Sequence, residues 1–341
     1  MKIKTLAFLY NVRHKYPDPN DPRTQLEADF DDPETTDWQI RHLKNCGYKV
    51  IPIEADETAY LKLYKNKSKI DLAFNVSEGI YGKDREAHLP AMLEMLQIAY
   101  TGSSPLTQAL VLNKAKTKEV LMGNNIPTLA FRLYTDHSVI PEIDIKYPII
   151  VKPVAEGSSA GISNNSVVYN KSQLDKQVKY ILKTFRGEPA LVEAFLSGQE
   201  YSIAMIGNPP KILPIIEPVF SMLPKKYLPL DSLEVKWIFE EQGHTNYLRC
   251  PAGLNKKLKQ KIEEVCLNVW KALNIQDWCR IDLRLDNNGN PYILEVNSPP
   301  GILPPEISQT SYFPLAARKA GIEYEEMMKI IINSAVRRYT K

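Results

Sequence analysis

Short apolar runs and amphipathic stretches alternate over residues 1–103 of this chain. Three apolar runs have the length of buried strands: residues 6–9, 50–53 and 72–75. Residues 36–45 and 87–96 instead repeat apolar positions at helical spacing, and Gly47 stops the first of these stretches. This alternation predicts a βαβ arrangement and a mostly parallel N-terminal sheet.

Two further units follow the first one. A helix is expected over residues 114–122, a strand over residues 147–152 and a closing helix over residues 324–338. The pattern predicts an α/β protein with an α+β C-terminal part. We expect three domains, covering residues 1–103, 104–190 and 191–341. Two long polar stretches, residues 13–36 and 221–246, are predicted loops, and loops of such length are often functional.

Residues 281–297 have the pattern of a β-hairpin with a turn at Asn-Asn-Gly-Asn. Glu295 and Asn297 are two residues apart and should share one face, while the other face takes Tyr292, Leu294 and Val296. Pairing across the turn should bring Asp282 close to Glu295. Two carboxylates and an amide oxygen are ligands that Mg²⁺ accepts together with phosphate oxygens. From these residues alone, a hairpin whose polar face meets water explains the pattern equally well.

A lysine followed by a loop of small residues occurs in residues 151–162. Lys152 offers a compact positive charge, and the glycines and serines after it let backbone N–H groups approach an anion. The order of residues differs from a Walker A loop, and a simple turn is the commoner explanation of such a segment. Residues 191–200 then form an apolar strand in which Glu193 could meet an adenine edge and Glu200 a ribose, or which only connects domains.

Composition excludes several classes of protein. The chain has 341 residues, 44% hydrophobic and 24% charged, and its net charge of +3 is too small to indicate a nucleic-acid partner. Its four cysteines are scattered without a C-x-x-C pair, which favours reduced thiols in the cytoplasm. No apolar run is long enough to span a membrane. We therefore expect a cytoplasmic protein without nucleic-acid or membrane partners.

The order and spacing of these segments resemble the ATP-grasp superfamily and, within it, the D-alanine:D-alanine ligases. The resemblance covers nearly the whole chain after the first strand. It is carried by residues 100–103, 112–118, 151–161, 191–200, 226–227, 250–254, 280–297 and 300–301. Each stretch is modestly specific, but their common order makes the resemblance strong.

This resemblance implies a three-domain ATP-grasp fold that holds ATP between the central and C-terminal domains. The implied nucleotide contacts are Lys114, Lys152, Glu193, Phe195, Leu196, Glu200 and Lys226. The implied ligands of two Mg²⁺ ions, with Mn²⁺ as an alternative, are Asp282, Glu295 and Asn297. Ser158 and Tyr227 are similar to the family residues that close the site around the first substrate. Arg280 and the backbone N–H of Gly301 are similar to its oxyanion stabilisers.

The implied activity is ATP-dependent ligation of a carboxylate to an amine. ATP converts the carboxylate into an acyl phosphate, and a second substrate's amine attacks it to give a dipeptide or similar amide. Residues 221–246 are the expected lid, because an acyl phosphate must be kept from water. The implied partners are amino acids or small peptides and a second copy of the chain in a homodimer.

The chain departs from the family where substrates would bind. The family's glutamate loop after the first strand is missing, and Glu27 is the nearest candidate by position. Glu78 stands where the family has histidine, which favours a more cationic or hydrogen-bond-donating first substrate. Ser311 is the candidate for the second substrate's carboxylate, with Tyr312 where an aliphatic residue is usual. The resemblance therefore leaves the substrates open.

Two other functions fit part of the pattern. A non-catalytic ATP-binding regulatory protein would not need the metal, lysine and oxyanion residues together. An ATP-dependent phosphotransferase would not need the pair formed by Arg280 and Gly301. Product analysis with and without an amine separates all three functions.

Overall fold

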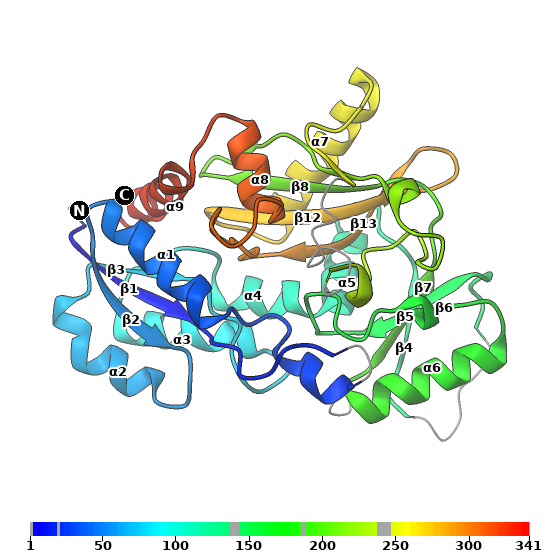
Figure 1. Ribbon diagram of the computed structural model, residues 1–341, viewed down its shortest axis with the longest axis horizontal. Coiled ribbons are helices and arrows are strands. Elements are labelled where there is room, and N and C mark those ends of the chain that lie inside the picture. The colour runs from blue at the N-terminus through cyan, green and yellow to red at the C-terminus, as the bar shows by residue number, and fades with distance from the viewer. Residues whose placement is uncertain (1–2, 19–20, 137–142, 186–187, 237–246, 341) are drawn as a thin grey trace.

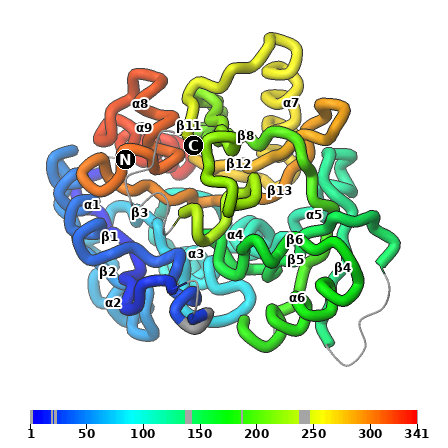
Figure 2. The backbone as a smooth tube through the Cα atoms, turned by 45° about the vertical axis from the view of Figure 1, so that its right-hand side comes forward, coloured from blue at the N-terminus to red at the C-terminus, as the bar shows by residue number. Residues whose placement is uncertain are grey.

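In the described residues, the computed structural model has three sheets of three or four strands and a fourth sheet of only two strands, β10 (Glu217–Pro218) and β11 (Leu248–Arg249) (Figure 1). The structure describes residues 3–18, 21–136, 143–185, 188–236 and 247–340. The two ends of the described chain lie on the same side, and Figure 2 shows α4 (Pro105–Leu112) near the middle, between the N-terminal and C-terminal sheets.

The N-terminal sheet has the strand order β2 (Lys49–Glu54), β1 (Thr5–Tyr10) and β3 (Leu72–Asn75), and both pairings are parallel. The predicted parallel sheet is confirmed. Its helices are α1 (Pro33–Asn45), α2 (Ala59–Asn66) and α3 (His88–Leu96). Phe8 and Phe74 are fully buried on neighbouring strands, as expected when both faces of a parallel sheet are covered.

The central sheet is antiparallel, with the order β4 (Phe131–Tyr134), β7 (Ala190–Ala194), β5 (Ile149–Pro153) and β6 (Val167–Val168). Helix α6 (Lys171–Thr184) buries Val178 and Ile181 in the same apolar core as Val151. The chain leaves this sheet only after Ala194. The division into domains at residues 103 and 190 stays a prediction.

The C-terminal sheet has the order β13 (Pro291–Asn297), β12 (Trp278–Leu285), β8 (Glu200–Ile206) and β9 (Lys211–Ile212), all antiparallel. The remaining elements are α5 (Lys114–Gly123), β10 (Glu217–Pro218), β11 (Leu248–Arg249), α7 (Lys256–Ala272), α8 (Tyr312–Lys319) and α9 (Tyr324–Tyr339). Helix α9 returns to the N-terminal unit, where His42 Nδ1 lies 2.7 Å from Glu325.

The predicted hairpin forms, and Asp282 pairs directly with Glu295. One part of the prediction is wrong. The register shifts after Asp282, so that Leu283 pairs with Ile293 and Leu294 is an extra residue on its strand. A bulge of this kind breaks the alternation of faces. Leu294 consequently lines the same pocket as Glu295 instead of facing the opposite side.

The predicted loop over residues 13–36 holds a short 3-10 helix, η1 (Pro22–Glu27), and then helix α1 begins at Pro33. Residues 237–246 of the predicted lid lie outside the described residues, and residues 221–236 are called the lid segment below. Within the described residues, no helix combines the length and the apolarity needed to cross a membrane.

Candidate active site

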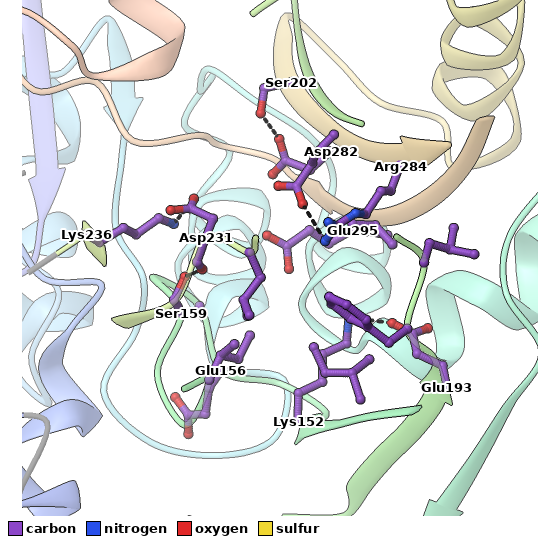
Figure 3. A pocket seen from close by; sticks show the side chains of 18 of the residues that line it. Lys152, Glu156, Ser159, Glu193, Ser202, Asp231, Lys236, Asp282, Arg284 and Glu295 are labelled. Carbon is purple, nitrogen blue, oxygen red and sulfur yellow. Dashed lines mark hydrogen bonds and ion pairs between the residues drawn. The ribbon is translucent and has the colours of Figure 1, made fainter. Parts of the chain in front are cut away.

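A pocket lies between the central and C-terminal sheets (Figure 3). Seven of the residues predicted for the site line it: Lys152, Glu193, Phe195, Leu196, Glu200, Asp282 and Glu295. They come from β5, β7, the turn after β7, and β8, β12 and β13. Residues far apart in the sequence therefore meet in one place.

Glu193 lies between two lysines inside the pocket wall. Its Oε1 is 2.7 Å from Nζ of Lys152, and its Oε2 is 2.7 Å from Nζ of Lys118. All three side chains are buried. Burial raises the pKa of Glu193, but the opposing effect of the two lysines is larger, so the pKa lies below its usual value. The trio carries one net positive charge, which suits an anionic ligand.

The sequence did not predict that Lys118 belongs to this site. It follows Lys114 by one helical turn on α5 and could have been taken for a surface lysine. Its ammonium also donates to Oγ1 of Thr128 at 3.0 Å. Burial lowers the pKa of Lys118 more than Glu193 raises it.

Asp282 is held from several sides. Arg280 donates to both of its carboxylate oxygens, with Nη2 2.9 Å from Oδ2, and Ser202 donates to Oδ1. Nδ2 of Asn297 lies 3.1 Å from Oδ2. The structure thus brings Arg280 and Asn297 together on the carboxylate of Asp282.

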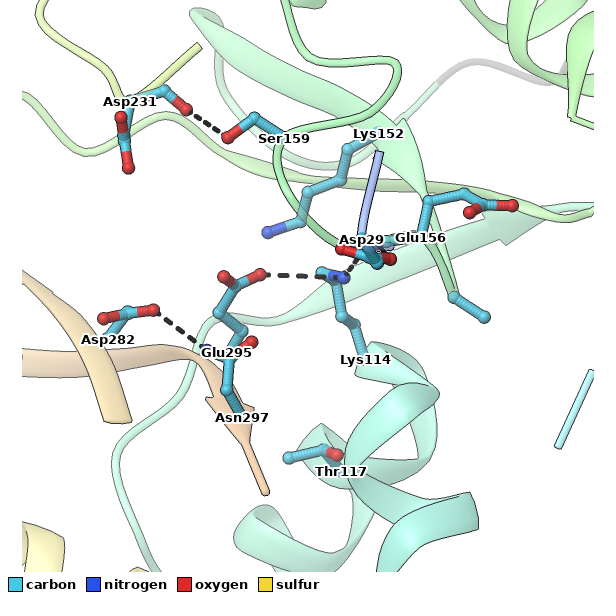
Figure 4. A network of polar contacts seen from close by, with 12 residues as sticks. Asp29, Lys114, Thr117, Lys152, Glu156, Ser159, Asp231, Asp282, Glu295 and Asn297 are labelled. Atoms are coloured by element: carbon cyan, nitrogen blue, oxygen red, sulfur yellow. Dashed lines mark hydrogen bonds and ion pairs between the residues drawn. The ribbon is translucent and has the colours of Figure 1, made fainter. Parts of the chain in front are cut away.

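Glu295 is surrounded by positive charge (Figure 4). Its carboxylate lies 3.6 Å from Nζ of Lys114, which also donates to the backbone oxygen of Glu156 at 2.6 Å. Burial alone would raise the pKa of Glu295, but Lys114, Lys152 and Arg280 lower it to about 2. Glu295 is therefore ionised at neutral pH and available to a cation.

The side chains of the site supply some, but not all, of the ligands that a Mg²⁺ ion needs. In the described residues, no three His, Cys, Asp or Glu side chains gather as a complete metal site. Asp282 and Glu295 supply two carboxylates, and Asn297 supplies an amide. Mg²⁺ commonly takes one or two carboxylates and completes its shell with phosphate oxygens and water, so these residues fit a metal that arrives with a nucleotide.

Glu200 lies at the other end of the pocket. Burial raises its pKa to about 7, although Arg284, 3.5 Å away, acts in the opposite direction. The guanidinium of Arg284 is 4.9 Å from the ring centre of Phe195. An aromatic ring and a carboxylate that both lie beside Arg284 suit a nucleoside, whose base stacks and whose ribose donates hydrogen bonds.

The lid segment contacts residues 157–162, which are called the glycine loop below. Ser159 Oγ donates to the backbone oxygen of Asp231 at 2.7 Å, and the Leu233 N–H donates to the oxygen of Ile162 at 2.9 Å. Lys236 lies 3.3 Å from the Asp231 carboxylate and lines the pocket. Lys236 is a second residue that the sequence reasoning missed.

Lys226 and Tyr227 are not brought to this pocket. They line a second hollow together with Gln173 and Lys176 of α6. The ammonium of Lys226 lies over the Tyr227 ring at 4.8 Å from its centre. The hydrogen bond from Asn164 Nδ2 to the backbone oxygen of Lys226, 2.6 Å long, fixes this placement.

Residues 21–32, called the N-terminal loop below, contact the glycine loop (Figure 4). The N–H of Gly157 donates to Asp29 Oδ2 at 3.2 Å, and the N–H of Gly161 donates to Gln25 Oε1 at 3.0 Å. Ser158, between them, has a left-handed φ of 44°. Two N–H groups predicted to face an anion are therefore occupied by side chains from η1 and the residues after it.

Acidic side chains gather near this contact around Arg85. Its guanidinium lies 3.3 Å from Glu156 and 3.7 Å from Asp29. Burial raises the pKa of Glu86 and of Glu156 to about 8, and burial together with the charges of Glu86 and Asp29 raises that of Glu78. Glu27 is not part of this group, because its carboxylate accepts from the N–H groups of His14 and Lys15 at 2.6 and 3.1 Å.

The loop after β13 and the first residue of α8 hold the remaining predicted residues. Gly301 is exposed, and the next carbonyl, that of Ile302, accepts from Tyr324 Oη at 2.6 Å. Ser311 Oγ accepts from the N–H of Leu303 at 3.2 Å, so this hydroxyl shapes the loop. The Arg280 guanidinium lies 5.5 Å from the ring centre of Tyr312, which puts Tyr312 beside the site.

Comparison with known proteins decides the family. The profile of the family described as "D-ala D-ala ligase C-terminus" matches residues 132–333. A D-alanine–D-alanine ligase of Nitrosococcus oceani is 31% identical over 88% of this chain and 87% of its own length. The chain belongs to the D-alanine–D-alanine ligase family.

Other relatives agree with this membership. An uncharacterised protein of Sinorhizobium fredii is 32% identical over 95% of this chain and 92% of its own length. The crystal structure of a D-alanine–D-alanine ligase from Bacillus anthracis complexed with ATP matches with a TM-score of 0.73 and 23% identity, covering 98% of each chain. The ATP-grasp fold predicted from the sequence is confirmed.

Membership of the D-alanine–D-alanine ligase family also gives the class of reaction. The chain is an ATP-dependent carboxylate-amine ligase, an enzyme that forms a C–N bond, as its sequence predicts.

Proposed function

We propose that the pocket binds ATP with its adenosine at Phe195, Leu196 and Glu200 and its phosphates between Lys114, Lys152 and Lys236. The supporting observation is that different kinds of side chain line the two ends of the pocket. One end offers an aromatic ring beside a carboxylate, and the other gathers lysines around Glu295. Glu193 then acts through the lysines, and Lys236 takes the place on the lid that the sequence assigned to Lys226.

Asp282, Glu295 and Asn297 would hold Mg²⁺, or Mn²⁺ in its place, with two ions as the working number. A metal held by these residues would supply positive charge to neutralise the phosphates during γ-phosphoryl transfer. Glu295 is kept ionised by its lysine neighbours, so it needs no proton loss before it binds a cation. Asn297 orients Asp282 through the 3.1 Å hydrogen bond.

The ligation step uses fixed positive charge beside Asp282. Arg280 is oriented by three hydrogen bonds from Nε and Nη2 to that carboxylate, and Tyr312 covers its guanidinium. We assign Arg280, with the Gly301 N–H, to the oxyanion formed when the amine attacks the acyl phosphate. Ser158 closes this region, and Ser311 supports the loop that receives the second substrate.

The first substrate is an amino acid or small peptide with a cationic group. Asp29, Glu78, Glu86 and Glu156 surround a single arginine, so this end of the site has an excess of acidic groups. Asp29 replaces Glu27 as the acidic residue of the N-terminal loop in this role. Burial holds protons on Glu86 and Glu156 at neutral pH; a cationic side chain beside them would favour their ionised forms and be attracted by them, whereas the uncharged side chain of D-alanine would not.

The experiment is an ADP-release assay across D- and L-amino acids, singly and in pairs, with mass spectrometry of the products. We expect ADP and an amide in equal amounts, with a basic amino acid preferred as the first substrate. Equal ADP release with and without an amine would contradict ligation. A clear preference for D-alanine in both positions would contradict the cationic assignment while leaving ligation intact.

We also propose that the enzyme is cytoplasmic and works as a homodimer without a nucleic-acid partner. All four cysteines are unpaired, which suits a reducing compartment. The homodimer follows from the family resemblance alone, and light scattering in solution tests it.

A further inference from the structure

Arg284 is a buried arginine at the nucleotide end of the pocket. It lies on β12 directly opposite Glu200 of β8, and its side chain is 4% exposed. The guanidinium stands near two aromatic rings, 4.9 Å from the centre of Phe195 and 5.5 Å from that of Phe220. A charged group placed here costs free energy unless it is fully paired, so its partners matter.

Those partners come from three different segments. Nε donates to the backbone oxygen of Gly198 at 2.9 Å, in the turn after β7. Nη2 donates to the backbone oxygen of Pro229 at 2.6 Å, in the lid segment. Nη1 lies 3.5 Å from Oε2 of Glu200. One planar side chain thus ties the lid to two of the residues assigned above to adenosine, Phe195 and Glu200.

The lid contact matters because the other end of the lid carries Lys236. Between Pro229 and Lys236 the lid touches the glycine loop through Asp231 and Leu233. A change in the position of Pro229 would therefore also move Lys236 and the contact with Ser159, at the phosphate end of the pocket. Arginine suits this task because its rigid fork holds several acceptors in one plane.

We propose that Arg284 is a positioning residue that couples nucleotide binding to closure of the lid segment. The proposal rests on the nucleotide placement given above. A nucleoside that contacts Phe195 and Glu200 fixes two of the groups around Arg284, and the arginine in turn holds Pro229. The lid then shields the acyl phosphate from water until the amine attacks.

Substitution separates coupling from simple packing. Arg284→Met keeps a long stem between the two rings but removes every donor, and Arg284→Lys keeps the charge without the fork. Arg132→Met is the matched control, because Arg132 is an exposed arginine of β4 whose side chain is 52% exposed in an ion pair with Asp144. Thermal unfolding of each variant checks that it folds.

Two readouts report the coupling. The first is the ratio of ADP released to amide formed, and the second is hydrogen exchange of residues 228–233 with and without a non-hydrolysable ATP analogue and Mg²⁺. We expect Arg284→Met to raise the KM for ATP about tenfold, to raise the ADP-to-amide ratio at least about twofold, and to abolish nucleotide-induced protection of the lid. Arg284→Lys should show smaller changes in the same direction, and Arg132→Met none.

An unchanged ratio and unchanged protection in Arg284→Met would overturn the proposal. If Arg284→Met does not fold, the same two readouts are taken from Arg284→Lys. A wild-type ratio and wild-type protection in Arg284→Lys would show that the guanidinium fork is not needed and would overturn the proposal. Failure of the proposed function looks different. The wild type would then protect its lid with nucleotide yet form no amide with any pair of substrates.

Discussion

Lys226 and Lys236 lie on the same lid segment, but only Lys236 faces the pocket. Lys236 lines the pocket close to Asp231, whereas Lys226 lies over Tyr227 at the second hollow. Sequence similarity favoured Lys226 because a lysine-tyrosine pair stands there. The position of a lysine within a long loop depends on how the loop folds, which a motif of two residues does not determine.

Replacing these lysines one at a time tests which of them serves the nucleotide. We expect Lys236→Met to lower kcat/KM for ATP roughly a hundredfold, the size of effect seen when one fixed donor to transition-state charge is lost. Lys226→Met is the matched control and should stay within about twofold of wild type, because exposed surface changes rarely matter more. Steady-state kinetics with varied ATP measures both, and the opposite ranking would return the role to Lys226.

Glu295→Gln tests the metal assignment. The amide keeps the shape of the side chain but removes its negative charge, which Lys114 and Lys152 stabilise in the wild type. We therefore expect the Mg²⁺ concentration for half-maximal turnover to rise about tenfold or more. Thermal unfolding without metal checks that the variant folds, because the lowered pKa of Glu295 means that its charge also stabilises the folded protein. Wild-type magnesium dependence in this variant would remove Glu295 from the metal site.

The acidic group around Arg85 predicts a pH dependence. Burial holds protons on Glu86 and Glu156 up to about pH 8. These groups gain charge as the pH rises through that value, so attraction for a cation increases. We expect the ratio of kcat/KM for a basic over a neutral first substrate to rise between about pH 7 and about pH 9. A flat or falling ratio would contradict cation selection by these carboxylates.

At the scale of elements, the glycine loop and the N-terminal loop depend on each other. A side chain at Gly157 would collide with the Asp29 carboxylate, which accepts the Gly157 N–H. We expect Gly157→Ala to raise the KM for the first substrate about tenfold and to change the KM for ATP less. Gly123→Ala is the control, since a Cβ there meets nothing within 4 Å. Equal effects on both KM values would mean that the loop contact does not serve the first substrate.

Much of the element order was predictable because strands and helices follow local periodicity. β3 matches its predicted range, and the pairing of Asp282 with Glu295 follows from the turn. The bulge at Leu294 was not predictable, because an extra residue in one strand leaves no mark in the apolar pattern. The partners of Glu193 and of Arg85 were also hidden, since each contact joins residues distant in the sequence.

At the scale of the whole molecule, the N-terminal unit holds the loop that carries Gly301. Gln39 of α1 and Tyr324 of α9 both donate to the carbonyl of Ile302, and the His42 ring lies between Glu306 and Glu325 at 3.0 and 2.7 Å. The proposed oxyanion donor therefore depends on packing between the two ends of the chain. This explains how residues near both termini take part in one site.

The central claim is that ATP activates a carboxylate as an acyl phosphate before the amine attacks. The most direct measurement uses a first substrate with both carboxylate oxygens labelled as ¹⁸O, followed by mass spectrometry of the phosphate and the amide. Formation of an acyl phosphate transfers one carboxylate oxygen to the phosphate, so each amide formed should be matched by one phosphate that carries a single ¹⁸O. Unlabelled phosphate released together with amide would contradict the account.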